Sequence, residues 1–138
     1  MVNSSNKSIG LLGGSFDPAH KGHLKISKIA IKKMKLVKVF WAITKKNPFK
    51  KKPLYSLQQR KSFAKKIAKN EEKIQVIQLD ETVKSSRSIK IIDYLIDKKK
   101  LKIIYFLIGS DNLIQFHKWK SWKKIVKKTK LTVFSRRG

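Results

Sequence analysis

Residues 9–23 read IGLLGGSFDPAHKGH, and this stretch decides the fold. An apolar run from Ile9 to Leu12 gives way to two glycines and a Ser-Phe-Asp-Pro turn, and two histidines follow where a helical pattern begins. Glycines let the backbone approach an anion closely, and a helix N-terminus offers unpaired N–H groups and a positive dipole potential. Because imidazoles also donate hydrogen bonds to phosphate oxygens, the stretch predicts a strand, a phosphate-binding turn and a helix.

Strand and helix patterns alternate along the rest of the chain. Strands are expected at residues 7–13, 37–43, 74–79, 102–108 and 131–134. Helices are expected at residues 22–36, 56–70, 88–99 and 119–128, the second of them with Ser56 as its N-cap. This order predicts an α/β fold: a Rossmann-like open parallel sheet of about five strands with helices on both faces. Ligands of such sheets bind at the carboxyl ends of the strands, where residues 13–23, 44–50 and 109–119 would converge.

The composition bounds the class of protein. With 138 residues, 41% of them apolar, the chain is expected to form a single domain over residues 1–138. It has no cysteine, which excludes a disulfide framework and a thiolate metal site. No apolar run approaches the ~20 residues of a membrane span, and residues 1–8 lack the apolar segment of a signal peptide. A cytoplasmic protein without a membrane partner is therefore expected.

The charge is strongly positive, with 35 Lys and Arg against 8 Asp and Glu and a formal net charge of +27. Such a balance is typical of proteins that bind polyanions such as nucleic acid. However, the lysines are spread along the whole chain, and all but four of the cations are lysine, whereas sequence-specific readers favour arginine. We therefore expect no specific nucleic-acid partner, and a basic nucleic-acid-binding module is the least favoured alternative.

The string from Gly13 to His23 resembles the GxFDPxHxGH signature of the nucleotidyltransferase superfamily. Three later stretches resemble bacterial nicotinate-nucleotide adenylyltransferases within it: an NPFK loop at residues 47–50, a GSD step at 109–111 followed by FHKWKSW at 116–122, and SRRG at 135–138. Arg60 also fits the arginine of the family's second helix. The resemblance covers nearly the whole chain from residue 7 onward.

The resemblance implies a function and a set of site residues. The protein would be an enzyme that joins ATP and nicotinate mononucleotide to give deamido-NAD and pyrophosphate, in NAD biosynthesis, with Mg²⁺ carried by ATP. His20 and His23 would be catalytic and would hold the ATP triphosphate. The other residues implied in ATP binding are Gly13, Gly14, Ser15, Phe16, Gly109 and Asp111. Those implied in binding the mononucleotide are Lys50, Arg87, Asp111, which would contact the ribose, and Trp119, which would stack on the pyridine ring.

Roles outside this set also follow. Trp122 is expected to pack in the core. Asp17 is expected to fix the turn and cap the backbone that follows it rather than to act as a base. The sequence has no cluster of carboxylates that would predict a metal-binding site formed by the protein alone. The oligomeric state is left open by the sequence.

Two features depart from the family pattern. Residues 86–91 read SRSIKI where the family has a Ser-aromatic-Thr step that helps to receive the nicotinate carboxylate, although Arg87 offers a cation for that group. The family's C-terminal ISSTxIR motif, which grips the ATP phosphates, is expected to be absent from this domain. Two further alternatives therefore stay open: another nucleotidyltransferase, such as a pantetheine-phosphate adenylyltransferase, and a truncated nucleotide-binding protein without turnover.

Overall fold

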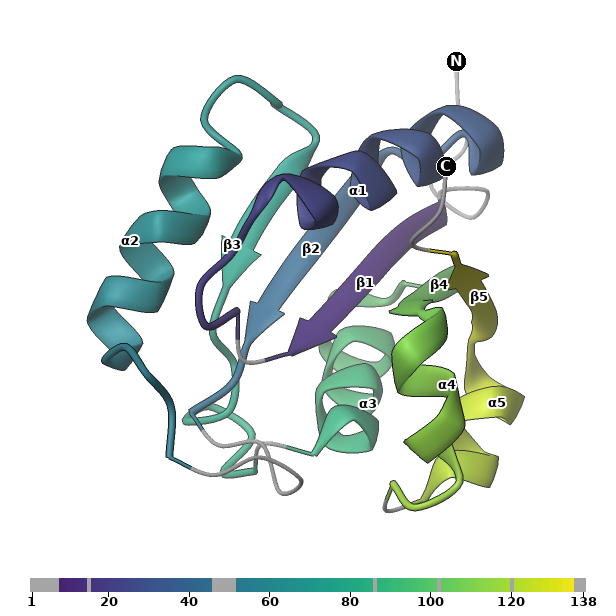
Figure 1. The fold of residues 1–138 in the computed structure, drawn as a ribbon. Helices are drawn as coiled ribbons and strands as arrows, with labels where there is room; N and C mark the ends of the chain where they lie inside the picture. The colour runs from purple at the N-terminus through teal and green to yellow at the C-terminus, as the bar shows by residue number, and fades with distance from the viewer. Residues whose placement is uncertain are drawn as a thin grey trace.

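The computed structural model describes residues 8–14, 16–45, 52–85, 87–101, 103–119 and 121–135. The strands in these ranges are β1 (Ser8–Gly14), β2 (Lys38–Ile43), β3 (Ile74–Ile77), β4 (Ile103–Gly109) and β5 (Lys130–Phe134). The helices are α1 (Lys21–Met34), α2 (Leu57–Ile67), α3 (Ser88–Lys99), α4 (Ser110–Phe116) and α5 (Trp122–Lys128). All strands pair in parallel in the order β3-β2-β1-β4-β5, as Figure 1 shows. The predicted five-stranded parallel α/β sheet is confirmed.

The central strands bury both of their faces. Ile9 and Leu11 of β1 join a core with α3 and α5, whereas Leu12 joins a second core with α1 and α2. Alternate residues of β4 divide in the same way, with Phe106 on the α3 side and Leu107 on the α1 side. Because successive strand residues point to opposite faces, a continuous apolar run serves two helical layers at once.

The helices α1 and α2 begin with side-chain caps that the sequence encodes. Ser56 caps α2 by accepting the backbone N–H of Gln59 at 3.1 Å, and the Gln59 side chain accepts the N–H of Ser56 at 3.0 Å. This reciprocal pair satisfies two of the donors that a helix start leaves unpaired. The N-cap of α1 is His20, described below. The expected cap at Ser56 is thus confirmed.

The segment after β4 differs from the sequence-based expectation. Residues 110–116, expected to be loop, form the short helix α4, and the helix expected from residue 119 begins at Trp122. Trp119 therefore lies in the turn between α4 and α5, where its N–H donates to the carbonyl of Phe116 at 3.0 Å. Ser121, with φ of 62°, adopts a left-handed conformation that a continuous helix excludes. The expectation that one helix over residues 119–128 carries both Trp119 and Trp122 was wrong.

The topology places the site. β1 is central, and the chain leaves it through α1 toward one face, while α3 covers the other face. Ligands of open α/β sheets bind at such a switch point, beyond the carboxyl ends of the strands. There the end of β1 comes close to the start of α3, since a Cβ atom on Gly13 would lie 4.0 Å from Oγ of Ser88. Within the described ranges, no helix has the length and apolar composition needed to cross a membrane.

Candidate active site

The start of α1 is built from two imidazoles. His20 is the N-cap, and its Nδ1 accepts the backbone N–H of Gly22 at 3.0 Å. His23 is the third helical residue, and its Nδ1 accepts the backbone N–H of His20 at 3.1 Å. The two rings lie 4.1 Å apart between centroids. These histidines occupy the places that Ser and Glu take in an ordinary capping box.

The caps determine which nitrogen of each ring carries hydrogen. A neutral imidazole has one N–H donor and one acceptor nitrogen. Because Nδ1 is the acceptor in both His20 and His23, we assign the hydrogen to Nε2 in both rings. Each ring then carries its N–H at Nε2 and lies at the positive end of the α1 dipole. This arrangement suits the binding of phosphate oxygens.

Gly22 is required by the position of the His20 ring. A Cβ atom at residue 22 would lie 2.7 Å from Cε1 and 2.8 Å from Nδ1 of His20. Any larger residue would displace the ring from the N–H that it caps. The H-x-G-H spacing thus has a local steric reason that is independent of any ligand.

Phe16 supports the second histidine from the core. Its side chain is buried, and the centroid of its ring lies 4.6 Å from that of the His23 ring and 5.5 Å from that of the Trp41 ring. Trp41 in turn donates from Nε1 to Oγ of Ser27, which donates to the carbonyl of His23, both at 2.8 Å. Phe16 was predicted to bind ATP; because its ring is buried here, such a contact would be made through its backbone.

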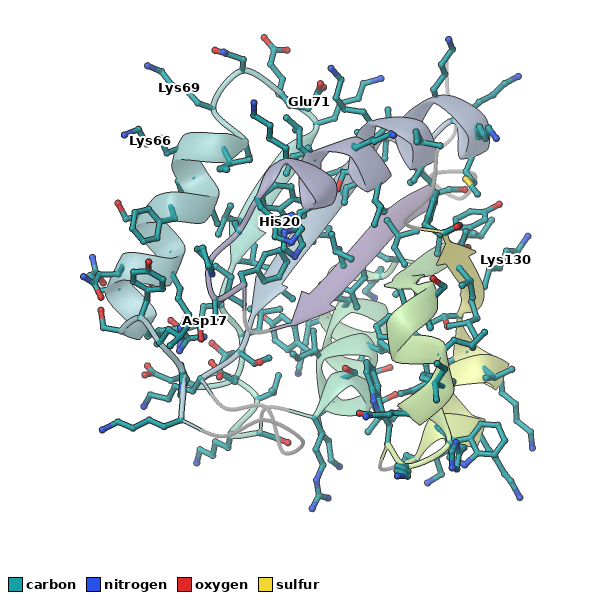
Figure 2. The ribbon with its side chains drawn as sticks, in the orientation of Figure 1. Asp17, His20, Lys66, Lys69, Glu71 and Lys130 are labelled. Carbon is teal, nitrogen blue, oxygen red and sulfur yellow. The ribbon has the colours of Figure 1, made fainter. Side chains whose placement is uncertain are left out.

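Figure 2 shows where the turn before α1 runs: His20 begins α1, and Asp17 lies beside the start of α2. The carboxylate of Asp17 accepts the backbone N–H groups of Leu54 and Tyr55, at 2.6 Å and 2.9 Å. Asp17 thus ties the turn to amides 37 and 38 residues away in sequence, whereas the sequence suggested a cap on the backbone that directly follows it.

The other predicted site residues divide between described and undescribed parts. Gly14 ends β1 with φ of +151°, a conformation that favours glycine. Gly109 is the N-cap of α4, with open space where its Cβ atom would be. Ser15 and Lys50 lie outside the described residues, as does the side chain of Asp111, so their roles stay predictions.

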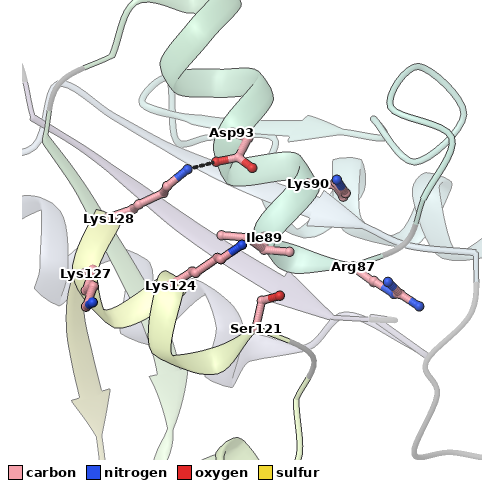
Figure 3. Close-up of a pocket in the computed structure, with 8 residues that line it drawn as sticks. All are labelled: Arg87, Ile89, Lys90, Asp93, Ser121, Lys124, Lys127 and Lys128. Carbon is pink, nitrogen blue, oxygen red and sulfur yellow. Dashed lines mark hydrogen bonds and ion pairs between the residues drawn. The ribbon is translucent and has the colours of Figure 1, made fainter.

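Arg87, predicted to receive the substrate carboxylate, is the exposed N-cap of α3. It lines a groove of about 330 Å³ between α3 and α5 (Figure 3). The groove is lined by Arg87, Ile89, Lys90, Asp93, Ser121, Lys124, Lys127 and Lys128. The ammonium of Lys128 donates to the carboxylate of Asp93, and this hydrogen bond raises the pKa of Lys128 above its ordinary value. The groove is therefore strongly cationic.

Trp119, predicted to stack on the pyridine ring, is half-buried. Its ring meets Phe106 edge-on at 5.9 Å and lies 5.3 Å from Phe116. Trp122 is also half-buried, 6.2 Å from Phe116. Both tryptophans therefore pack against the core cluster, and the part of Trp119 that stays accessible is what could meet a ligand.

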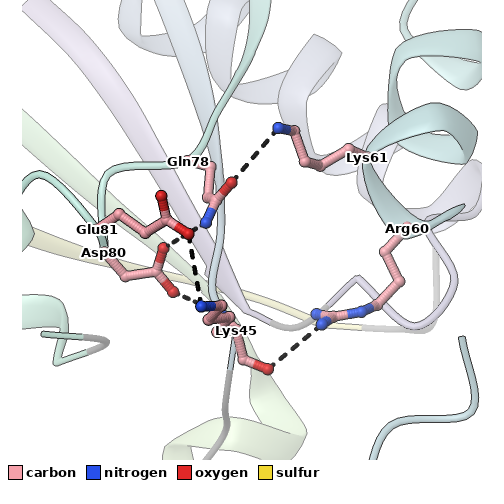
Figure 4. Close-up of polar contacts among 6 residues, drawn as sticks. All are labelled: Lys45, Arg60, Lys61, Gln78, Asp80 and Glu81. Atoms are coloured by element: carbon pink, nitrogen blue, oxygen red, sulfur yellow. Dashed lines mark hydrogen bonds and ion pairs between the residues drawn. The ribbon is translucent and has the colours of Figure 1, made fainter. Parts of the chain in front are cut away.

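Sequence reasoning gave no role to a polar cluster at the ends of β2 and β3 (Figure 4). Arg60 of α2 is 2% exposed and donates to the carbonyls of Thr44, Lys45 and Tyr55, at 2.8, 3.3 and 3.2 Å. Asp80 is 5% exposed, and its carboxylate accepts the N–H of Lys45 and the side-chain amide of Gln78. The available signal was the use of arginine at position 60 on a helix whose other cations are lysines.

Comparisons with known proteins agree with this geometry. A family described as cytidylyltransferase-like matches residues 11–137. A Pelagibacter ubique protein named "probable nicotinate-nucleotide adenylyltransferase" is 51% identical over 137 residues, which are 99% of this chain and 76% of that protein. A Bradyrhizobium protein (strain ORS 278) of the same name is 36% identical over 93% of this chain and 67% of its own length.

Solved structures show the same fold at low sequence identity. The Plasmodium falciparum nicotinic acid mononucleotide adenylyltransferase complexed with NaAD has a TM-score of 0.71 and 18% identity, over 96% of this chain and 77% of that one. The crystal structure of a "putative nicotinate-nucleotide adenylyltransferase" from Vibrio parahaemolyticus has a TM-score of 0.78 and 16% identity, over 96% of this chain and 76% of that one.

Proposed function

The chain belongs to the cytidylyltransferase-like family and, within it, to the nicotinate-nucleotide adenylyltransferases, and from this premise we propose that it makes deamido-NAD from ATP and nicotinate mononucleotide. In this reaction a phosphate oxygen of the mononucleotide attacks the α-phosphorus of ATP in line. The new P–O bond forms as the bond from the α-phosphorus to the α,β-bridging oxygen breaks, and pyrophosphate leaves with that electron pair. No covalent enzyme intermediate is required.

The observation that carries the proposal is the pair of capped histidines at the start of α1. Phosphoryl transfer depends on positioning and on stabilising charge at the phosphate oxygens. Because His20 and His23 are held by backbone N–H groups at Nδ1, their Nε2–H groups are oriented before a ligand arrives. Preorganised donors of this kind need no reorganisation in the transition state.

The mononucleotide would bind at the neighbouring strand end. We propose that Asp111 contacts its ribose, that Trp119 stacks on its pyridine ring, and that Lys50 and Arg87 meet its phosphate and its carboxylate. A large π-face suits an electron-poor ring, and Trp119 follows α4 within three residues. Arg87 provides the cation that a nicotinate carboxylate needs, in the sequence that replaces the family's Ser-aromatic-Thr step.

Mg²⁺ would enter with ATP. Among the residues that the structure describes, no three His, Cys, Asp or Glu side chains gather into a metal-binding group. Mg²⁺ is commonly held by substrate phosphates with few protein ligands, so the donor set here fits a metal carried by the nucleotide. When bound, the ion would neutralise charge on the phosphates.

A direct assay tests the proposal. The purified chain is incubated with ATP and Mg²⁺ and, in parallel, with nicotinate mononucleotide, nicotinamide mononucleotide or phosphopantetheine. We expect pyrophosphate release and a deamido-NAD peak with nicotinate mononucleotide. Preference for phosphopantetheine would favour the pantetheine-phosphate alternative. Binding of both nucleotides without product would identify a nucleotide-binding protein without turnover.

A further inference from the structure

Thr44 and Tyr55 hold the phosphate-binding turn between β1 and α1 from both ends. At its start, the N–H of Thr44 donates to the carbonyl of Gly14 at 3.1 Å. At its end, the carboxylate of Asp17 accepts the N–H of Tyr55 at 2.9 Å and that of its neighbour Leu54. The first bond ends the parallel pairing of β1 with β2, one residue beyond Ile43, and the second lies outside both the sheet and α1, so the turn depends on two segments elsewhere in the chain.

One buried guanidinium joins those two segments. Nη1 of Arg60 donates to the carbonyl of Thr44 at 2.8 Å, and Nε donates to the carbonyl of Tyr55 at 3.2 Å. Arg60 is 2% exposed, and burying a guanidinium is costly unless hydrogen bonds satisfy it. Its planar fork spans carbonyls from separate segments, which a lysine ammonium cannot reproduce. The chain uses lysine at all but four of its 35 cationic positions. The arginine at position 60 is therefore explained by the need to donate to carbonyls of two segments at once.

The turn itself requires such support. Phe16 has φ of 49°, a left-handed conformation that costs free energy in a residue other than glycine. Such strain persists where the surrounding structure over-determines it. The Phe16 ring also lies against the His23 ring. A shift of the turn would therefore be passed to the His23 ring.

We propose that Arg60 is a positioning residue: it locks Thr44 to Tyr55 and thereby holds the Gly14–Asp17 turn and the His20/His23 pair in their phosphate-binding arrangement. The assignment of phosphate to these histidines rests on the proposed function. A role limited to capping α2 does not account for the contacts, because Ser56 already caps that helix, and Nη1 and Nη2 of Arg60 reach Thr44 and Lys45 outside it.

The test compares Arg60→Lys with the control variant Gln59→Ala. The control removes the side chain that accepts the N–H of Ser56, so it perturbs the start of the same helix without touching Arg60. The ring Cε1–H signals of the histidines are followed by NMR, with His117, at the C-cap of α4, as the internal reference. Arg60→Lys should shift or broaden the His20 and His23 signals and leave that of His117 in place. Gln59→Ala should move none of them.

Inorganic pyrophosphate at physiological salt supplies the second readout. His23→Ala defines the histidine-dependent part of the affinity, and Arg60→Lys should weaken binding by about three- to tenfold, while Gln59→Ala should not. In the adenylyl-transfer assay, Arg60→Lys should lower kcat by roughly 10- to 100-fold with a smaller change in KM for the mononucleotide. If Arg60→Lys does not fold, Asp17→Asn is used instead. This change replaces one of the carboxylate oxygens that accept the N–H groups of Leu54 and Tyr55 by an amide donor.

The outcomes separate the two proposals. If the unmodified chain and His23→Ala bind pyrophosphate equally, the proposed function fails at this site, and the role of Arg60 is judged on the histidine signals alone. If Arg60→Lys leaves the His20 and His23 signals unchanged, or moves all three histidines alike, Arg60 has only a structural role and the inference is overturned.

Discussion

His23 accepts, at Nδ1, the backbone N–H of His20 at 3.1 Å, so each histidine of the H-x-G-H motif is part of the other's environment. The cap places both rings before any ligand is present. It also means that removing one ring releases a backbone donor of the helix start. Function and local stability are thus coupled at α1.

Replacing His23 by alanine should lower kcat by about 10²–10³-fold, the range for losing one preorganised donor to developing charge. The binding of nicotinate mononucleotide should change much less, because charge on the transferring phosphoryl oxygens is greatest in the transition state. Steady-state kinetics with pyrophosphate release as the readout measures both effects. His117→Ala, which removes the exposed histidine after α4, is the control. A loss below about threefold in kcat would mean that His23 is structural.

Gly22→Ala tests the steric reason for the glycine. The new Cβ atom would lie 2.7 Å from the His20 ring, so the ring must leave its cap, at a cost of about 0.5–2 kcal/mol. Alanine favours a helix by up to about 1 kcal/mol over glycine, which offsets much of that loss. We therefore expect a near-normal free energy of unfolding together with weaker pyrophosphate binding, measured by urea denaturation and calorimetry. Lys28→Ala, at an exposed position in the middle of the same helix, should leave both nearly unchanged; a Gly22→Ala variant that binds pyrophosphate normally would refute the steric argument.

The parts of the site that could be predicted are those whose causes are local. The glycine turn, the following helix start and the two histidines are adjacent in sequence, so periodicity and spacing were sufficient to place His20 and His23 at the carboxyl end of β1. The cap at Ser56 was predictable for the same reason, since its Gln59 partner is three residues away.

The parts that could not be predicted depend on long-range contacts or on a single backbone conformation. Asp17 accepts hydrogen bonds from amides 37 and 38 residues away in sequence. Arg60 donates to the carbonyl of Thr44, just after β2, and to that of Tyr55, just before α2. Neither leaves a periodic signal. The sequence pattern suggested a helix from residue 119 onward. Because Ser121 is left-handed, the helix begins only at Trp122, and Trp119 lies in the turn before it.

The two tryptophans should differ in their effect on ligand binding but not in contributing to stability. Because both pack against Phe116, alanine at either position should destabilise the fold, by less than the roughly 3–5 kcal/mol of a fully buried large-to-small change. Only Trp119→Ala should also weaken mononucleotide binding, by about 1–3 kcal/mol, the scale of one aromatic stack. Urea denaturation and calorimetry separate the two effects. Trp119→Phe should recover most of the affinity; equal affinity losses at both positions would contradict a stacking role for Trp119.

The ion pair between Lys128 and Asp93 predicts a dependence of stability on alkaline pH. The hydrogen bond to Asp93 raises the pKa of Lys128 in the folded state. A raised pKa stabilises the fold fully below the unfolded-state value of about 10.4, and the contribution is lost as pH rises through the folded-state value. The gap in Tm between the unmodified chain and Asp93→Asn should therefore stay constant from neutral pH up to about 10 and narrow above it.

The size of this effect is limited by exposure, because pairs at a solvent-exposed surface contribute little and are screened by salt. The loss in Asp93→Asn should be well below that in Ile125→Ala, which removes a fully buried side chain of α5 at about 2–5 kcal/mol. Glu72→Gln removes the same charge from an exposed site outside the groove and controls for the net charge of +27. Thermal melts followed by circular dichroism at several pH values provide the comparison. A gap that persists unchanged well above the lysine pKa, or one that Glu72→Gln reproduces, would show that the pair does not join α5 to α3 in solution.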